Sequence, residues 1–236
     1  MDLAGTWSHL LPWELGYDKA DILFAYSRYI LPHPVDWPAN AHVTGYWQLP
    51  IPADWTPPID LVQFLESGPT PVYFGPGSMR SEKLQGLLSM VVSSARKLGQ
   101  RVVFDVPPED IPKEFNRNDI ISAKGIPHAW LFPKMSYVIH HGGSGTSGST
   151  VTAGVPNSGL AFSVDQSFWA KRLYLLGIGP SALPASRLIA NHVVRMILGG
   201  IGNADYRSQA EKIREKISGE DGIAKAISII HERLGI

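Results

Sequence analysis

The chain has 236 residues and a formal net charge of zero, with 21 basic and 21 acidic side chains. Because nucleic-acid-binding domains are typically basic, this balance argues against a nucleic-acid partner. The absence of cysteine excludes disulfides and thiolate metal sites. No apolar run approaches the roughly 20 residues of a transmembrane helix, so the sequence predicts a cytoplasmic protein with no transmembrane segment.

The first 57 residues differ from the rest of the chain. They hold five of the seven tryptophans and many of the prolines. Residues 21–26 and 41–46 have the composition of strands, but two strands cannot form a core alone. We therefore expect residues 1–57 to be the remnant of another domain with a linker, and residues 58–236 to form a second domain.

From residue 58 onward, predicted strands and helices alternate. Helices are expected over 58–66, 81–98, 147–153 and 165–175, and strands over 71–74, 101–105, 119–122, 136–139 and 157–162. The tail, residues 188–234, reads as helices broken near Gly199-Gly200 and Gly219. This alternation predicts an α/β fold with a Rossmann-like, doubly wound parallel sheet.

A glycine-rich turn follows the strand at 136–139, in the sequence Tyr137-Val-Ile-His-His-Gly-Gly-Ser-Gly-Thr146. Glycines allow backbone N–H groups to approach an anion closely, and a helix N-terminus adds roughly half a positive charge. The turn therefore predicts a diphosphate site. His140 and His141 lie at its edge, and an imidazole N–H can donate to a phosphate oxygen. Either ring could take this role while the other packs in the core.

The same turn also fits a different ligand. Residues 143–148 match the dinucleotide pattern G-x-G-x-x-G, and Asp165 follows about 20 residues later, where a ribose-binding acid is expected. An NAD(P)-binding protein is therefore the alternative. Against it, the dinucleotide pattern normally opens its domain, whereas here several strand–helix units precede it. No P-loop, nucleophile elbow or metal-binding motif is present.

Two other groups of residues point to ligand binding. Gly75-Pro-Gly-Ser78 follows a strand and forms either a second binding turn or a plain connection. Asp165 and Gln166 begin a predicted helix. A carboxylate and an amide side by side match vicinal sugar hydroxyls, although an aspartate there also serves as an N-cap.

Five ordered blocks of sequence together resemble a known family. These are residues 73–79 (YFGPGSM), 126–133 (IPHAWLFP), 140–146 (HHGGSGT), 154–156 (GVP) and 165–169 (DQSFW). They look like the C-terminal half of family 1 UDP-glycosyltransferases, in particular the sterol 3-beta-glucosyltransferase group. The resemblance runs from about residue 18 to the C-terminus.

The resemblance implies the C-terminal domain of a GT-B fold, which binds a nucleotide sugar. It implies an inverting, metal-independent transfer of a sugar, with a lean toward glucose, from a UDP-sugar to a hydroxyl of a sterol or other lipid, with no cofactor. By the same resemblance, Ile126 and His128 hold the uracil and ribose, and Asp165 and Gln166 bind the sugar hydroxyls. The diphosphate is assigned to Ser78, His140 or His141, Gly143, Ser144, Gly145 and Thr146.

The chain also departs from the family pattern. Pro76 replaces a usual phenylalanine, and Val164 stands where glycine usually precedes the Asp-Gln pair. The family's general-base histidine lies in an N-terminal domain, so no catalytic residue is assigned here and the chain alone is expected to be inactive. It would be an excised part, one subunit of a split enzyme, or a non-catalytic nucleotide-sugar-binding subunit.

The resemblance to the C-terminal half alone also bears on possible binding partners. An N-terminal-half partner chain, a homo-oligomer and peripheral membrane contact are all compatible with this interpretation. The C-terminal helix, which in the family crosses to the first domain, is expected to lack a packing surface.

Overall fold

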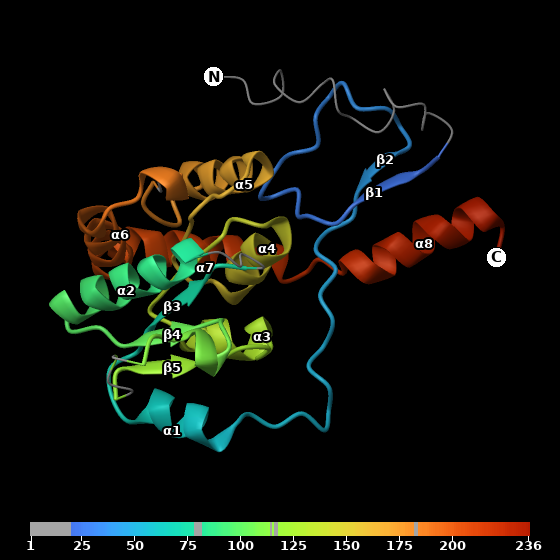
Figure 1. Ribbon diagram of the computed structural model, residues 1–236. Coiled ribbons are helices and arrows are strands. Elements are labelled where there is room, and N and C mark those ends of the chain that lie inside the picture. The colour runs from blue at the N-terminus through green and yellow to red at the C-terminus, as the bar shows by residue number, and fades with distance from the viewer. Residues whose placement is uncertain (1–19, 78–81, 114, 116–117, 182–183) are drawn as a thin grey trace. The chain divides into compact units, whose positions relative to one another are not determined.

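The computed structural model describes residues 20–77, 82–113, 115, 118–181 and 184–236 (Figure 1). Two compact units are present. The larger unit is Pro50–Ser218, and the smaller unit combines the described residues up to Leu49 with Gly219–Ile236. The boundary expected from the sequence lay at residues 57 and 58, with the whole C-terminal tail in the larger domain. The structure instead groups the last helix with the N-terminal segment.

The larger unit is built on a parallel sheet of five strands, in the order β5-β4-β3-β6-β7. Its strands are β3 (Val72–Gly75), β4 (Val102–Phe104), β5 (Ile120–Ser122), β6 (Tyr137–His140) and β7 (Asn157–Gly159). Helices cover both faces: α1 (Ile59–Glu66), α2 (Glu82–Lys97), α3 (His128–Leu131), α4 (Ser144–Ala153), α5 (Val164–Leu175), α6 (Ala190–Gly202) and α7 (Ala204–Ile217). The predicted α/β fold with a doubly wound parallel sheet is confirmed.

The core consists of two apolar layers, one on each face of the sheet. Successive residues of a strand point to opposite faces, so Phe74 packs in the layer with α2 and α6, whereas Tyr73 packs in the layer with α1 and α3. Both side chains are at most 1% exposed. Because both faces are covered, the inner strands β3, β4 and β6 are mostly continuous apolar runs rather than alternating ones.

The strand order reverses next to β3. The chain goes from β3 outward to β4 and β5, then returns so that β6 pairs with the other edge of β3. In open α/β sheets, ligands bind at such a reversal, outside the carboxyl ends of the strands. Here the register places Gly75 of β3 opposite His140 of β6. The two glycine-rich turns therefore leave the sheet side by side.

Two helix boundaries differ from the sequence prediction. Helix α4 begins at Ser144, so the glycine-rich turn is shorter than expected and leads directly into a helix N-terminus. The break predicted near Gly199-Gly200 lies slightly later, at Asn203, because α6 continues to Gly202 before α7 begins at Ala204. Gly200 packs directly against the ring of Tyr137. A Cβ built on it would lie 2.4 Å from the ring of Tyr137.

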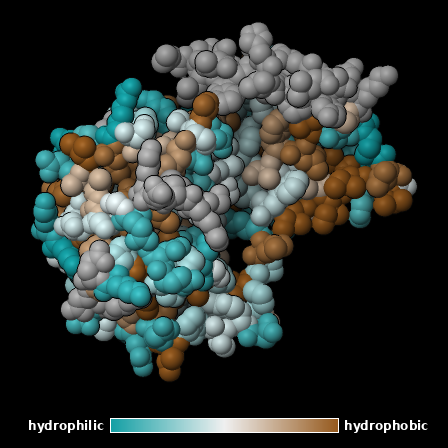
Figure 2. Space-filling view, in the orientation of Figure 1, coloured by the Kyte–Doolittle hydropathy of each residue, from teal (hydrophilic) through white to brown (hydrophobic). Residues whose placement is uncertain are grey.

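The smaller unit pairs strands β1 (Ile22–Phe24) and β2 (Ala41–Val43) in parallel and adds helix α8 (Gly222–Leu234). The start of α8 packs closely on the chain after β2, since a Cβ on Gly222 would lie 2.6 Å from the carbonyl of Gly45. The expectation that the C-terminal helix lacks a packing surface is therefore wrong. Most of α8 is nevertheless exposed, and Figure 2 shows apolar surface along it, to which Ile227, Ile230 and Leu234 contribute.

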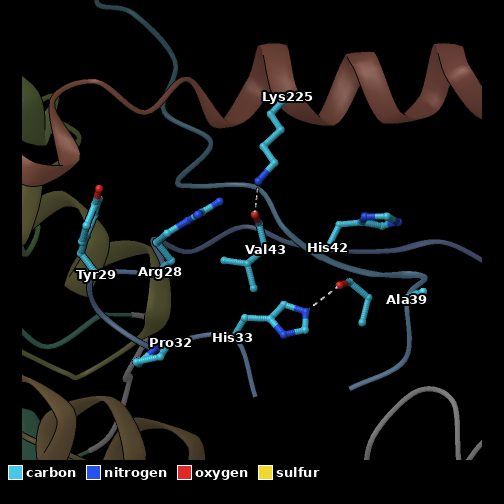
Figure 3. Close-up of a pocket in the computed structure, with 9 residues that line it drawn as sticks. Arg28, Tyr29, Pro32, His33, Ala39, His42, Val43 and Lys225 are labelled. Atoms are coloured by element: carbon cyan, nitrogen blue, oxygen red, sulfur yellow. Dashed lines mark hydrogen bonds between the residues drawn. The ribbon is translucent and has the colours of Figure 1, made fainter. Parts of the chain in front are cut away.

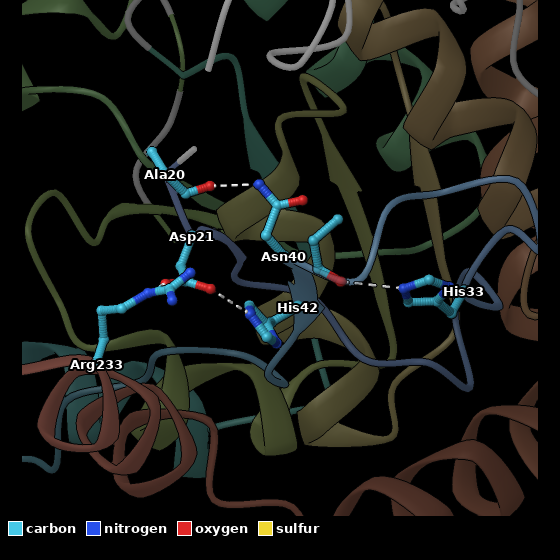
Figure 4. Close-up of polar contacts among 7 residues, drawn as sticks. Ala20, Asp21, His33, Asn40, His42 and Arg233 are labelled. Atoms are coloured by element: carbon cyan, nitrogen blue, oxygen red, sulfur yellow. Dashed lines mark hydrogen bonds and ion pairs between the residues drawn. The ribbon is translucent and has the colours of Figure 1, made fainter. Parts of the chain in front are cut away.

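Polar contacts also tie α8 to the two strands. Lys225 Nζ donates to the Val43 carbonyl at 2.7 Å, beside a cavity of about 640 Å³ (Figure 3). Asp21 contacts His42 Nε2 at 2.9 Å and the guanidinium of Arg233 (Figure 4). No predicted site residue that the structure describes lines this cavity.

Candidate functional site

The two glycine-rich turns meet at the carboxyl edge of the sheet in the larger unit. The His141 N–H donates to the Gly75 carbonyl at 3.0 Å, which joins the turn after β6 to the turn after β3. Gly77 and Gly142 have φ angles of +69° and +82°. L side chains rarely adopt this backbone conformation, so glycine is required for these two turns.

His141 lies between the two turns. A Cβ on Gly77 would be 2.7 Å from its ring, and a Cβ on Gly143 would be 2.3 Å from its Nε2. The ring is half-buried, and burial lowers its pKa, while Gly75, Asp105 and Asp165 oppose the shift. His141 is therefore a neutral imidazole near neutral pH. It can offer an N–H at the mouth of the turns.

His140 is in a different position. Its side chain is fully buried at the end of β6, and its Nδ1 accepts the Gly142 N–H at 3.1 Å. Burial lowers the pKa of His140 to about 3. Because Nδ1 is an acceptor, the neutral ring carries its proton on Nε2. His140 thus holds the turn from inside, whereas His141 lies at the surface of the site.

The N-terminus of α4 follows at once. Gly143 is its N-cap, and no side chain among the described residues caps this end of the helix. The first turn contains Ser144, Gly145 and Thr146, which are half-buried or exposed. Helix N-termini leave backbone N–H groups without intrahelical partners, and these groups favour anions. This end of α4 can therefore bind a phosphate group.

Asp165 and Gln166 lie beside the turn after β6. A Cβ on Gly142 would be 2.7 Å from the Gln166 carbonyl oxygen. Ser163, rather than Asp165, is the N-cap of α5. Asp165 accepts the Ser163 hydroxyl at 2.5 Å, which lowers the pKa of its exposed carboxyl, and Gln166 Oε1 accepts the Phe162 N–H at 2.8 Å. The Asp165 carboxylate and the Gln166 amide N–H₂ can reach hydroxyl groups of a ligand.

The predicted nucleoside residues lie between β5 and α3. The Ile126 N–H donates to the Ala123 carbonyl at 3.3 Å, and Ile126 is half-buried. His128 begins α3 and stacks on Phe132, with ring centroids 4.1 Å apart and an interplanar angle of 14°. Burial lowers the pKa of His128. A flat, neutral ring therefore lies at the same edge of the sheet.

Sequence reasoning missed three residues here. Asp105 follows β4, and its carboxylate lies 3.2 Å from Lys124 Nζ. Asp105 also acts electrostatically on His128 and His141. The buried Tyr73 places its hydroxyl 3.3 Å from His128 Nε2. A carboxylate directly after a buried parallel strand was the available signal for Asp105, because such positions share the carboxyl edge of the sheet.

The structure thus brings most of the predicted residues to one edge. His140 is the described exception, since it is sealed beneath the site, and Ser78 lies outside the described residues. Within the part of the chain that the structure describes, no three His, Asp or Glu side chains are grouped to hold a metal ion. No described helix is both long and apolar enough to span a membrane.

The burial of His140 predicts acid sensitivity. The unfolded ring takes up a proton near its ordinary pKa of about 6.5, whereas the folded ring does so only near pH 3. Between these values the unfolded state binds more protons, so stability falls as pH falls. We expect the free energy of unfolding to drop by about 2 kcal/mol more between pH 7 and pH 5 than in a His140→Gln chain. The free energy of unfolding of both chains is measured by urea denaturation at the two pH values. An equal fall in the two chains would contradict this prediction.

Comparisons with known proteins agree with this geometry. The family model of the erythromycin biosynthesis protein CIII-like C-terminal domain matches residues 89–227. A sterol 3-beta-glucosyltransferase of Arabidopsis thaliana is 29% identical over 216 residues, covering 89% of this chain and 33% of that protein. The chain therefore spans about a third of the length of this relative.

Solved glycosyltransferases have the same fold. The spinosyn forosaminyltransferase SpnP superposes with a TM-score of 0.73 at 18% identity, covering 100% of this chain and 62% of SpnP. A UDP-glucose:anthocyanidin 3-O-glucosyltransferase, solved in complex with UDP, superposes with a TM-score of 0.59 at 19% identity, over 74% of this chain and 43% of that one. The fold is that of a GT-B C-terminal domain. The chain belongs to the glycosyltransferase family of the erythromycin biosynthesis protein CIII-like C-terminal domain, and the resemblance to sterol glucosyltransferases is confirmed.

Proposed function

We propose that this chain is the donor-binding part of an inverting, metal-independent glycosyltransferase that moves glucose from UDP-glucose to a hydroxyl of a sterol or other lipid. One observation carries the proposal. The open N-terminus of α4 and the neutral ring of His141 lie together where two glycine turns meet at the strand reversal. An uncapped helix start beside an N–H donor suits a diphosphate.

The remaining roles are those that the sequence resemblance implies. The first turn of α4, Gly143 and His141 bind the diphosphate, together with Ser78. Ile126 and His128 hold the nucleoside, and Asp165 and Gln166 hold the sugar hydroxyls. When an acceptor hydroxyl attacks the anomeric carbon in line, the bond to the diphosphate breaks and negative charge develops on the leaving oxygen. The backbone N–H groups of α4 and the His141 N–H stabilise that charge without rearranging.

The relatives support this donor and acceptor class. The Arabidopsis relative is named a sterol 3-beta-glucosyltransferase, and the anthocyanidin enzyme was solved with UDP bound. No residue of this chain is assigned the role of general base. Such a base contributes roughly two to four orders of magnitude in rate, so we propose that the chain alone transfers sugar at a negligible rate.

Calorimetry with UDP, UDP-glucose and NAD tests the proposal. We expect UDP and UDP-glucose to bind and to stabilise the folded chain, by about 2.7 kcal/mol at a concentration 100 times Kd. NAD should do neither. The pattern at residues 143–148, followed by Asp165, favours a dinucleotide as the second candidate. Binding of NAD without UDP would establish that candidate and overturn the proposal, as would binding of neither.

A further inference from the structure

The cavity of about 640 Å³ in the smaller unit is lined by β2, by the segment that follows β1 and by helix α8 (Figure 3). All of its lining residues belong to this one unit. None of them is among the residues proposed above to bind the donor. Pockets that bury a small organic ligand typically have a volume of roughly 300 to 1,000 Å³. The cavity is therefore a candidate for a second ligand site.

The walls of the cavity are mainly apolar. Ala41 and Val43 of β2 are only 3% and 6% exposed, so they form its most sheltered part. The other apolar lining residues are Tyr29, Pro32 and Ala39. The loop after β1 is held against β2, because His33 Nε2 lies 3.1 Å from the Ala41 carbonyl oxygen. Since burial of apolar surface is favourable by about 25 cal/mol per Å², these walls suit a ligand with an apolar body.

Two of the lining side chains are cations, and no aspartate or glutamate lines the cavity. Lys225 Nζ donates to the Val43 carbonyl at 2.7 Å, which uses one of its three protons and leaves two. Arg28 is exposed and has no hydrogen-bond or ion-pair partner among the described residues. Positive charge therefore lies beside the apolar walls with donors to spare.

Acidic side chains that adjoin the lining residues are engaged elsewhere. Asp21 contacts His42 Nε2 at 2.9 Å and also pairs with Arg233. Asp221, four residues before Lys225, is the N-cap of α8 and accepts a backbone N–H of its first turn at 2.9 Å. An anionic ligand would supply the charge that these carboxylates do not, because cations form their strongest hydrogen bonds with ionised acceptors.

We propose that this cavity binds a single-chain lipid with an anionic head group, a carboxylate or a phosphate. The apolar chain lies against Ala41, Val43 and the ring of Tyr29, and the head group pairs with Arg28 and Lys225. A guanidinium presents its N–H donors in a planar fork, which matches two oxygens of either head group. The inference does not depend on UDP binding, because no donor-binding residue takes part.

Titration calorimetry with lipids below their micelle concentrations tests the site. We expect oleate, oleoyl-lysophosphatidate or both to bind, and the tighter of the two identifies the preferred head group. Monoolein has the same chain without a charge and should bind about tenfold more weakly than that lipid. Acetate and glycerol 3-phosphate lack the chain and should show no binding. If neither anionic lipid binds, or if monoolein binds as tightly, the inference is wrong.

Two substitutions separate the charge from the apolar walls. Arg28→Gln should weaken binding of the anionic lipid about tenfold and leave monoolein unchanged. Ala39→Phe fills the cavity from an exposed position and should weaken both lipids. Arg195→Gln, which changes an exposed arginine on α6 of the larger unit, is the matched control and should bind lipid normally. All three chains should keep the melting temperature and the UDP titration of the unmodified chain. Anionic-lipid binding that either Arg28→Gln or Ala39→Phe leaves unchanged would overturn the inference, whether or not UDP binds.

Discussion

A His141→Ala chain is expected to bind UDP about 30-fold more weakly than the unmodified chain, equivalent to about 2 kcal/mol for a hydrogen bond to a charged group. The ring lies between Gly77 and Gly143, and Gly143 is the N-cap of α4. Because the ring is only half-buried, its loss should change the free energy of unfolding by no more than about 1 kcal/mol. Titration calorimetry and urea denaturation measure the two quantities.

The His140→Ala chain is expected to show the reverse. The removed ring is fully buried and accepts the Gly142 N–H, so the chain should lose about 3 kcal/mol of stability. UDP affinity of the folded protein should stay within about threefold, because the ring does not reach the ligand. If His140→Ala lost the affinity and His141→Ala kept it, the two roles would be exchanged and the diphosphate site would lie deeper than proposed.

His140 and His141 show why the sequence could locate the site but could not tell which histidine faces the ligand. Apolar strands in a covered parallel sheet do not alternate, so nothing in Tyr137 to His141 tells which histidine is the last buried residue. The structure decides this by ending β6 at His140 and turning the chain at Gly142. The order of strands and helices was predictable because amphipathic spacing and glycine turns are local signals.

Contacts across the sheet were less accessible from the sequence. Tyr73 and His128 are 55 residues apart, and their meeting depends on the strand order rather than on any local pattern. Helix α8 is similar, since it packs on the segment after β2 through Gly222 and Gly45, which are distant in sequence. Such pairs follow from topology, which composition and periodicity do not specify.

The glycines in α6 are a second ambiguous signal in the sequence, because a glycine pair can mark either a helix break or a close contact. Substitution of one of them has the largest stability effect that we expect outside the site. In Gly200→Ala, the new methyl would lie 2.4 Å from the ring of Tyr137, a fully buried side chain on β6. Because a helix backbone and a central strand cannot both move away, we expect a loss of about 3 kcal/mol. A glycine pair reads as a helix break in sequence, whereas here one member makes room for an aromatic ring.

Gly199→Ala is the matched control, one residue away in the same helix. The nearest atom to its Cβ is 3.9 Å away on Pro180, which is ordinary contact. Alanine restricts the unfolded chain more than glycine does, so this variant should gain about 0.5–1 kcal/mol. Thermal and urea denaturation of both chains measure the difference. Equal destabilisation by both substitutions would mean that α6 requires the flexibility of the glycine pair and not the space beside Tyr137. The position of β6, and of the turn that carries His141, would then not depend on the contact between Gly200 and Tyr137.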